Sequence, residues 1–213
     1  MKIKYLGQQS TPKLDSYSAN FLDPIPRHNQ HLNKFFGLDY WNAYEFSYLN
    51  SKNLPTIETL EIKISMHSEF TVESKSLKLY LASFYNKKFN NAPKSTLIAK
   101  FQNKVPKNKV VHFQGFRSIC PVTSQPDWGN IYFHSSSNSM DSRKLIKFLK
   151  SYRNKGDFHE ACIESIFETV IIDFAVDDLT VYGKFLRRGG IDINPIRSTS
   201  KKLLFKNFRD FNQ

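Results

Sequence analysis

A stretch of this 213-residue chain occurs twice, and this repeat constrains the fold more than any single motif. Adding 68 to positions between Glu73 and Lys87 pairs ten residues with ten others, of which six pairs are identical and four conserve chemistry. Both copies place apolar residues at helical spacing, and the shared serine, asparagine and charged positions are harder to obtain by chance than that spacing. We therefore expect a duplicated strand–helix unit. The identical pairs include Ser74 with Ser142, Leu77 with Leu145, Leu81 with Leu149 and Asn86 with Asn154.

Local patterns around the repeat predict an α+β protein. Leu60, Ile62 and Ile64 alternate with polar residues, which is typical of a half-buried antiparallel strand. The lead-in, residues 1 to about 55, is rich in proline, asparagine and serine, and the aromatic cluster at its end suggests a short helix near 41–50. The other expected elements are a strand reaching Glu73, helices at 74–85, 141–153 and 158–174, and strands at 110–119, 130–135 and 179–186.

Charge and cysteine content narrow the functional classes only in part. The formal net charge is +12, and residues 85–109 contain seven lysines without one acidic residue. Such a field attracts the phosphates of nucleic acid or of a phosphorylated cofactor, but it also fits a solvated basic surface. The chain has two cysteines, no apolar run long enough to span a bilayer and no signal-peptide pattern at its N-terminus. We expect a cytoplasmic protein with reduced thiols and no membrane partner.

The segment from Cys120 to Gly129 places a thiol seven residues before a carboxylate, with two prolines between them. A thiol attacks only as the thiolate and ordinarily ionises near pH ~8.5, so a fixed polar partner assists it at neutral pH. Cys120 and Asp127 are therefore candidates for covalent catalysis, with Cys120 attacking an electrophilic carbon and Asp127 handling the proton. Taken alone, the pair also fits a buried structural cysteine and a turn aspartate.

Two further segments carry candidate binding residues. Glu73, Ser74 and Lys75 fall at the start of the first expected helix, where a hydroxyl, free backbone N–H groups and lysines would suit a phosphate. A serine-capped helix with solvated lysines is the structural alternative. His159 and Glu160 begin the third expected helix, and an ionised Glu160 suits the N–H donors on the Watson–Crick edge of a guanine-like base. The helix dipole alone would also favour a carboxylate there.

Two common kinds of site are not indicated. The six histidines are scattered, no His-Glu-x-x-His motif occurs and two cysteines cannot form a four-thiolate cage, so no metal site is predicted. No Gly-x-Gly-x-x-Gly motif occurs either. Any dinucleotide would therefore bind without the Rossmann fingerprint.

Four motifs occur together in one order: ESKSLKLYLASF at 73–84, CPVTSQPDWG at 120–129, FHEACIESIF at 158–167 and RRGGIDINPIRS at 187–198. Together they resemble the NADPH-dependent 7-cyano-7-deazaguanine reductases, the nitrile reductases of queuosine biosynthesis, a tRNA modification pathway. The resemblance covers most of residues 41–198, in the motif order of the two-module form. It implies a tunnelling fold (T-fold), in which antiparallel sheets carry paired helices on one face. It also implies reduction of the nitrile of 7-cyano-7-deazaguanine (preQ0) to the aminomethyl group of preQ1 with two NADPH.

The resemblance further implies roles for residues that match the family motifs. Cys120 would form a covalent thioimide with the nitrile carbon, and Asp127 would donate the proton. These roles agree with residue chemistry elsewhere in the motifs, because carboxylates suit the edge of the base and cations suit the extra phosphate of NADPH. The implied contacts to the base are Val72, Glu73, Ser74, His159 and Glu160, and those to NADPH are Ser74, Lys75, Arg188 and Gly189.

The resemblance implies two tandem modules, at 1–109 and 110–213. The first would be shortened, because the 47 positions that separate Glu73 from Cys120 are far fewer than in the two-module members that the chain resembles. A shortened sheet has an exposed edge, which another subunit, the lysine-rich segment or charged side chains would have to cover. We expect a homo-oligomer. One alternative is an amidinotransferase of the same fold that acts on preQ0 in tRNA and needs no NADPH. Another is a non-catalytic basic nucleic-acid-binding protein. Lys75 and Arg188 argue against the first and the Cys120/Asp127 pair against the second, so no direct nucleic-acid partner is expected.

Overall fold

The computed structural model describes residues 3–7, 18–27, 35–49, 52, 55–85, 110–136, 140–201, 206–210 and 213. The strands are β1 (Pro24–Pro26), β2 (Phe36–Leu49), β3 (Pro55–Ser65), β4 (Phe70–Val72), β5 (Val110–Ile119), β6 (Pro126–His134), β7 (Thr180–Phe185) and β8 (Ile191–Ser198). The α-helices are α1 (Ser74–Tyr85), α2 (Ser142–Ser151) and α3 (His159–Asp173), and the short 3-10 helices are η1 (Ala19–Phe21) and η3 (Tyr152–Asn154). None of the described helices is long and apolar enough to cross a membrane.

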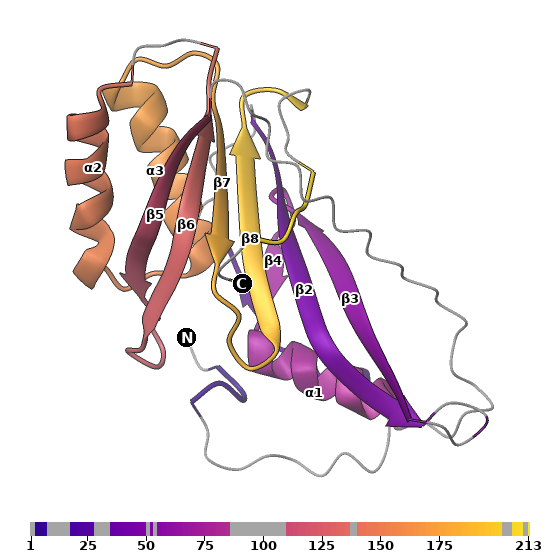
Figure 1. Cartoon of the computed structure of the whole chain (residues 1–213). Coiled ribbons are helices and arrows are strands. Elements are labelled where there is room, and N and C mark those ends of the chain that lie inside the picture. Colours follow the sequence, from indigo (N-terminus) through magenta and orange to yellow (C-terminus); the bar gives the residue numbers. More distant parts are fainter. Residues whose placement is uncertain are drawn as a thin grey trace.

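One six-stranded antiparallel sheet forms the centre of the molecule, in the order β3-β2-β8-β7-β6-β5 (Figure 1). The hairpin β2–β3 lies at one end and the hairpin β5–β6 at the other. Strand β8 joins the two halves of the chain because it pairs with β2, from Phe36 opposite Ser198 to Ala43 opposite Ile191. A separate two-stranded sheet of β1 and β4 lies beside the large sheet.

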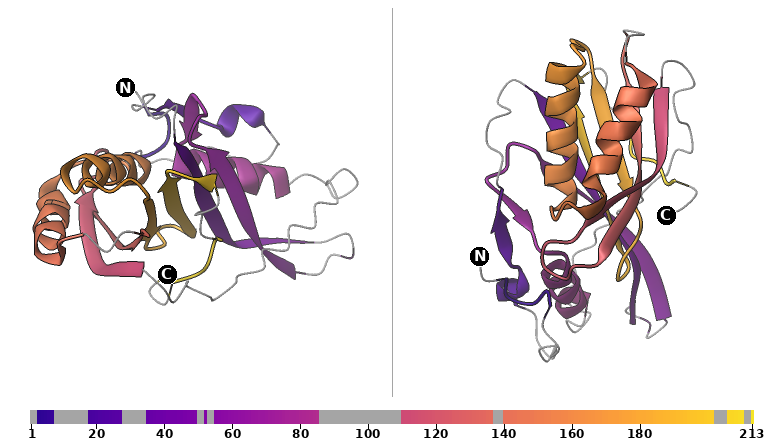
Figure 2. Two further views of the ribbon diagram at one scale, coloured as in Figure 1. Left: turned by 90° about the horizontal axis from the view of Figure 1, so that it is seen from above. Right: turned by 90° about the vertical axis from the view of Figure 1, so that its left-hand side faces the viewer.

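The helices pack on one face of the sheet, and the C-terminal residues cover the other (Figure 2). Side-chain alternation along β2 separates the two faces. Trp41 packs with Leu77 of α1 in the core on the helix side, whereas Tyr40 packs on the opposite face. There Phe208 contacts Tyr182 edge to face, with ring centroids 5.5 Å apart. The expected α+β class, with an antiparallel sheet and helices on one face, is confirmed.

Most expected elements lie where the sequence predicts them, and the differences have physical causes. The short helix near 41–50 is wrong, because this segment belongs to β2. The described part of β2 is buried on both faces, so its apolar residues do not alternate with polar ones. Strand β8 was not expected, because Asp192, Asn194 and Arg197 make it polar, yet all three are buried and hydrogen-bonded. Strand β6 begins at Pro126 instead of Asn130, and residues 86–109 lie outside the described residues.

The structure supports the internal repeat at its most distinctive point, the helix starts. Helices α1 and α2 begin at Ser74 and Ser142, the positions that the repeat equates. Each is capped by the preceding acidic side chain. Glu73 accepts the backbone N–H groups of Lys75 (2.6 Å) and Ser76 (2.7 Å), and Asp141 accepts the two N–H groups at the equivalent positions of α2 (2.8 and 3.3 Å). The two copies thus share a capping pattern as well as a spacing of apolar residues.

A buried lysine connects the C-terminal residues to the sheet. Lys184 of β7 is fully buried, and its Nζ donates to Asn207 Oδ1 (3.3 Å) and to the carbonyl of Phe208. Burial lowers the pKa of Lys184 to about 8, although the carboxylates of Asp192, Asp210 and Glu61 act in the opposite direction. The C-terminal residues are therefore held over the sheet by a cation that is costly to bury.

Replacing Lys184 by methionine should remove a pH-dependent contribution to stability. An unfolded lysine keeps its proton up to about pH 10.4, whereas folded Lys184 loses its proton at about pH 8. The unfolded chain then binds more protons between these values, so the free energy of unfolding should rise with pH there. We expect the free energy of unfolding to rise between pH 8 and 10 by about 2 kcal/mol more in the wild type than in the variant. Urea unfolding at each pH measures this difference. If the free energy of unfolding changed with pH in the same way in both proteins, this interpretation would be contradicted.

Candidate active site

A cavity of about 590 Å³ lies between the two halves of the chain, on the helix side of the sheet. The N-terminal half contributes β4 and the first turn of α1, and the C-terminal half contributes the β5–β6 turn, the start of α3 and the β7–β8 loop. Every site residue predicted from the sequence lines this cavity. These residues are Val72, Glu73, Ser74, Lys75, Cys120, Asp127, His159, Glu160, Arg188 and Gly189.

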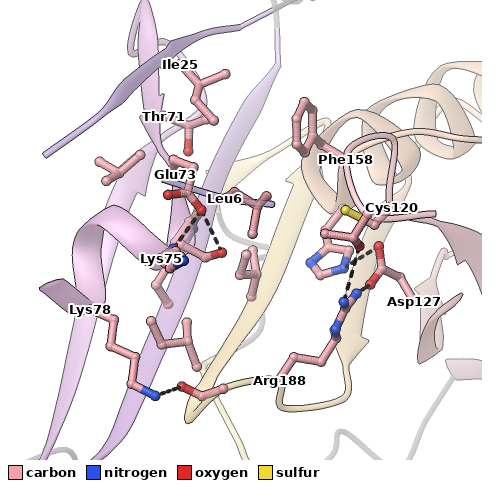
Figure 3. A pocket seen from close by; sticks show the side chains of 18 of the residues that line it. Leu6, Ile25, Thr71, Glu73, Lys75, Lys78, Cys120, Asp127, Phe158 and Arg188 are labelled. Carbon is pink, nitrogen blue, oxygen red and sulfur yellow. Dashed lines mark hydrogen bonds and ion pairs between the residues drawn. The ribbon is translucent and has the colours of Figure 1, made fainter. Parts of the chain in front are cut away.

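The turn after β5 presents Cys120 to the cavity (Figure 3). Its backbone is held at both ends, because Cys120 N–H donates to the Gln125 carbonyl (2.9 Å) and Ser124 N–H donates to the Cys120 carbonyl (3.0 Å). The residue is a free cysteine, and only 8% of its surface is exposed. A ligand in the cavity would therefore meet a thiol that is fixed in place and largely shielded from bulk water.

Asp127 lies on β6 beside the thiol and has two partners. One carboxylate oxygen forms an ion pair with Arg188, and the other lies 3.3 Å from Nε2 of His159. His159 is itself fixed by stacking on Phe185, with ring centroids 4.0 Å apart. Burial raises the pKa of Asp127, but the contacts with His159 and Arg188 outweigh burial and hold its pKa below the usual range. The carboxylate is therefore ionised at neutral pH and can accept a proton before it donates one.

Glu160 lies in the first turn of α3 and is buried. Its Oε1 accepts a hydrogen bond from Thr71 Oγ1 of β4 (3.3 Å), which is a direct contact between the two halves of the chain. Burial and the nearby carboxylate of Asp39 raise the pKa of Glu160, while His159 and Arg27 act in the opposite direction. Its charge at neutral pH thus depends on the groups around it.

Glu73 lies on the other side of the cavity and already has a structural role (Figure 3). The expectation of free N–H groups at the start of α1 is wrong at Lys75 and Ser76, because both N–H groups donate to the Glu73 carboxylate. A phosphate would have to compete with this cap. The cap also orients Glu73. Its Oε1 accepts two hydrogen bonds, from the Lys75 N–H and from the Ser74 hydroxyl (3.2 Å), so Oε2, which accepts from the Ser76 N–H, is the oxygen that keeps a lone pair for a ligand.

Cations and glycines gather at one end of the cavity. Lys78 Nζ donates to the carbonyl of Gly189 (2.7 Å), which connects α1 to the β7–β8 loop. Gly189 has a positive φ of 58°, and no atom lies within 4 Å of the place where a side chain would begin. Lys75 and Arg188 line the same cavity. Positive charge and open backbone suit a phosphorylated cofactor, and NADPH fits these residues on chemical grounds.

Several residues that line the cavity were not predicted. Phe158 and Gln125 lie within the motifs quoted from the sequence and could have been inferred from their positions close to His159 and Asp127. Leu6 and Ile25 come from the irregular lead-in and carry no sequence signal. Among the residues that the structure describes, no group of three or more His, Cys, Asp or Glu side chains could hold a metal ion.

Comparison with known proteins finds similarity to the family that the sequence motifs resemble. Residues 14–111 match a family described as nitrile reductase, 7-cyano-7-deazaguanine-reductase N-term, and residues 126–203 match one described as QueF-like protein. Proteins named NADPH-dependent 7-cyano-7-deazaguanine reductase are similar over nearly the whole chain. One from Coxiella burnetii (strain RSA 493 / Nine Mile phase I) is 33% identical, with 92% of each chain covered. One from Legionella pneumophila (strain Corby) is 34% identical, with 91% of this chain and 89% of the relative covered.

The alignment with the Coxiella burnetii protein extends over 258 positions, more than the 213 residues of this chain. The relative therefore contains residues that have no counterpart here. This difference agrees with the expectation that the chain is shorter than the two-module members of the family.

Proposed function

This chain belongs to the NADPH-dependent 7-cyano-7-deazaguanine reductase family, and from this premise we propose that it reduces the nitrile of preQ0 to the aminomethyl group of preQ1 in queuosine biosynthesis. The observation that carries the proposal is the shared cavity. A free thiol, an ionised carboxylate, a buried glutamate and a group of cations line one space between the two halves of the chain. Capture of a nitrile, recognition of a base and binding of a phosphorylated reductant need these groups together.

The first step we infer is addition of the Cys120 thiol to the nitrile. Asp127 accepts the thiol proton, the sulfur forms a bond to the nitrile carbon, and one bond of the triple bond becomes a lone pair on nitrogen. That nitrogen then takes the proton from Asp127, which returns to its ionised form. The product is a thioimide, whose imine-like carbon accepts hydride more readily than a nitrile carbon does. The ionised Asp127 of the resting site suits this sequence.

When bound, NADPH supplies hydride, and the four-electron reduction of a nitrile to an amine takes two equivalents. We assign Ser74, Lys75, Arg188 and Gly189 to its binding. After the first hydride the bond between the carbon and the Cys120 sulfur breaks, the thiolate leaves, and the resulting imine accepts the second hydride. Protons for the growing amine and for the departing thiolate come through Asp127, which His159 contacts. Arg188 forms an ion pair with Asp127, so the cofactor end of the cavity is directly connected to the group that moves the proton.

We assign recognition of the deazaguanine to groups from both halves of the chain that line the cavity. Glu160 would accept N–H donors of the base edge, with Val72, Glu73, Ser74 and His159 as further contacts. The hydrogen bond from Thr71 to Glu160 fixes one oxygen without using its second lone pair. The base would then be held with its nitrile directed to Cys120.

The purified protein should oxidise NADPH only when preQ0 is added, with about two equivalents consumed per nitrile. Absorbance at the NADPH band measures the oxidation, and mass spectrometry of the small-molecule product measures the aminomethyl group. A folded sample that shows no preQ0-dependent oxidation would refute the reductase activity. Covalent capture of preQ0 without any NADPH consumption would instead favour the amidinotransferase chemistry.

We further propose two tunnelling-fold modules, at 1–109 and 110–213, the first of them shortened. The boundaries of the two family matches support this division, because they fall at 111 and 126. In the described sheet β3 and β5 are the outer strands, and pairing with a second copy of the chain would cover such edges. A homo-oligomer and a cytoplasmic location remain predictions.

A further inference from the structure

Four charged side chains form a buried network behind the base end of the cavity. Arg27 Nη2 lies 2.5 Å from Asp39 Oδ2, and Arg27 Nη1 lies 3.8 Å from Glu164 Oε1. Arg197 contacts the same two carboxylates, at 2.7 Å from Asp39 Oδ1 and 2.5 Å from Glu164 Oε1. Each of the four side chains is at most 5% exposed. Two cations and two anions thus balance where water cannot screen them.

The network joins the two halves of the chain. Arg27 and Asp39 come from the N-terminal half, after β1 and on β2, and Glu164 and Arg197 come from α3 and β8 of the C-terminal half. The proposed function does not use any of these four residues. Loss of one member would leave an uncompensated buried charge instead of a solvated one.

Arg27 is also connected to Glu160 through the hydrogen bonds of the short β1–β4 sheet. Its N–H donates to the Glu69 carbonyl (3.1 Å), one step beyond the β1–β4 pairing in which Ile25 lies opposite Thr71. Thr71 in turn donates to the Glu160 carboxylate. Arg27 therefore ends the short sheet that delivers a hydrogen-bond donor to the base-binding carboxylate.

The charged groups that act on Glu160 come from every element packed around it. His159 precedes it on α3, and the carboxylate of Asp39 acts on it from β2. Arg27 acts from the end of β1, while Glu164, one helical turn later, is paired with Arg197 of β8. Of these groups, Asp39 is the anion that opposes a second negative charge at Glu160, and Arg27 is the cation that offsets it.

We propose that Arg27 is a positioning residue for base recognition: its guanidinium neutralises Asp39 behind the cavity, so that Glu160 stays charged and keeps both oxygens as acceptors. The inference rests on the proposed function, because it concerns the same base. Burial and the charge of Asp39 raise the pKa of Glu160, and Arg27 lowers it, as its contact with Asp39 would lead one to expect. A protonated Glu160 would offer a donor where the base also has donors.

The test is the pH dependence of preQ0 binding, measured by calorimetry on a Cys120→Ala background in which binding is reversible. Affinity should fall as the pH drops through the titration of Glu160. Arg27→Gln should move this midpoint up by about one pH unit, because Asp39 then keeps only Arg197 of its two cations and Glu160 loses a nearby positive charge. Arg27→Lys should keep the parent midpoint, and Asp39→Asn should move it down. Glu160→Gln should bind more weakly and lose the pH dependence.

Lys63→Gln is the matched control, because it removes a cation whose side chain is 58% exposed on β3. Its midpoint should equal that of the parent. The inference is overturned if Arg27→Gln binds preQ0 with the parent midpoint, or if Lys63→Gln shifts as far. If Arg27→Gln does not fold, Asp39→Asn provides the test. An unchanged midpoint of preQ0 binding in Asp39→Asn would also overturn the inference. A parent that binds no preQ0 at any pH would refute the proposed function itself.

Discussion

Replacing Cys120 by alanine is expected to abolish covalent capture of preQ0 and to slow preQ0-dependent NADPH oxidation by about 10⁴-fold or more. A nitrile is a weak electrophile, and only addition of the sulfur turns its carbon into an imine-like centre. Without the thiol, the base should still bind through Glu160 but should not react. Intact mass spectrometry without NADPH measures the first effect, because the wild-type mass should rise by one preQ0.

Cys162 provides the matched control for this experiment, because it is the other cysteine of the chain. It is fully buried on α3, and burial raises its pKa to about 12, although the hydroxyl of Ser118 acts in the opposite direction. A protonated thiol without access to the cavity cannot capture a nitrile. Cys162→Ala should therefore form the adduct normally. An adduct that persists in Cys120→Ala and disappears in Cys162→Ala would place the nucleophile at Cys162.

The junction of the two halves explains how a short first half brings Glu73 to a cavity that also contains Cys120. Strand β2 pairs with β8 along eight residue pairs, so the N-terminal hairpin extends the sheet of the C-terminal half. Helix α1 then lies on the same face as α3. All of the predicted site residues therefore line one cavity within a single chain.

The parts of this fold that were predictable are those with local patterns. The starts of α1 and α2 follow from the repeat and its acidic caps, and the site residues follow from motifs that share one order. Strand β8 was missed because its polar residues find partners only after folding, as Arg197 does with Glu164. Arg27 was missed for the same reason. It follows a three-residue strand that begins and ends with proline, and its partners are set by tertiary contacts that no local pattern records.

Replacing Asp127 by asparagine should slow thioimide formation by about 10²- to 10⁴-fold at neutral pH. The amide keeps the shape of the side chain but cannot accept the thiol proton. In the wild type the contacts with His159 and Arg188 keep the pKa of Asp127 below its usual range, despite burial. The carboxylate persists as the pH falls, so the rate of capture by the wild type should not decline between pH 7 and 5 through protonation of this group. Rapid mixing, quenching at set times and intact mass spectrometry measure the rate of capture at each pH.

The pH dependence of the variant distinguishes a base from a structural residue. If Asp127 accepts the proton, capture by Asp127→Asn must rely on solvent to remove it, and the rate should rise with pH where the wild-type rate is flat. A purely structural Asp127 would lower the rate by one factor at every pH and leave the shape of the profile unchanged. Asp141→Asn makes the same chemical change at the cap of α2, where asparagine also caps well, and should behave as the wild type. A flat profile in Asp127→Asn would therefore assign proton transfer to another group, and His159, 3.3 Å from the carboxylate, would be the next residue to test.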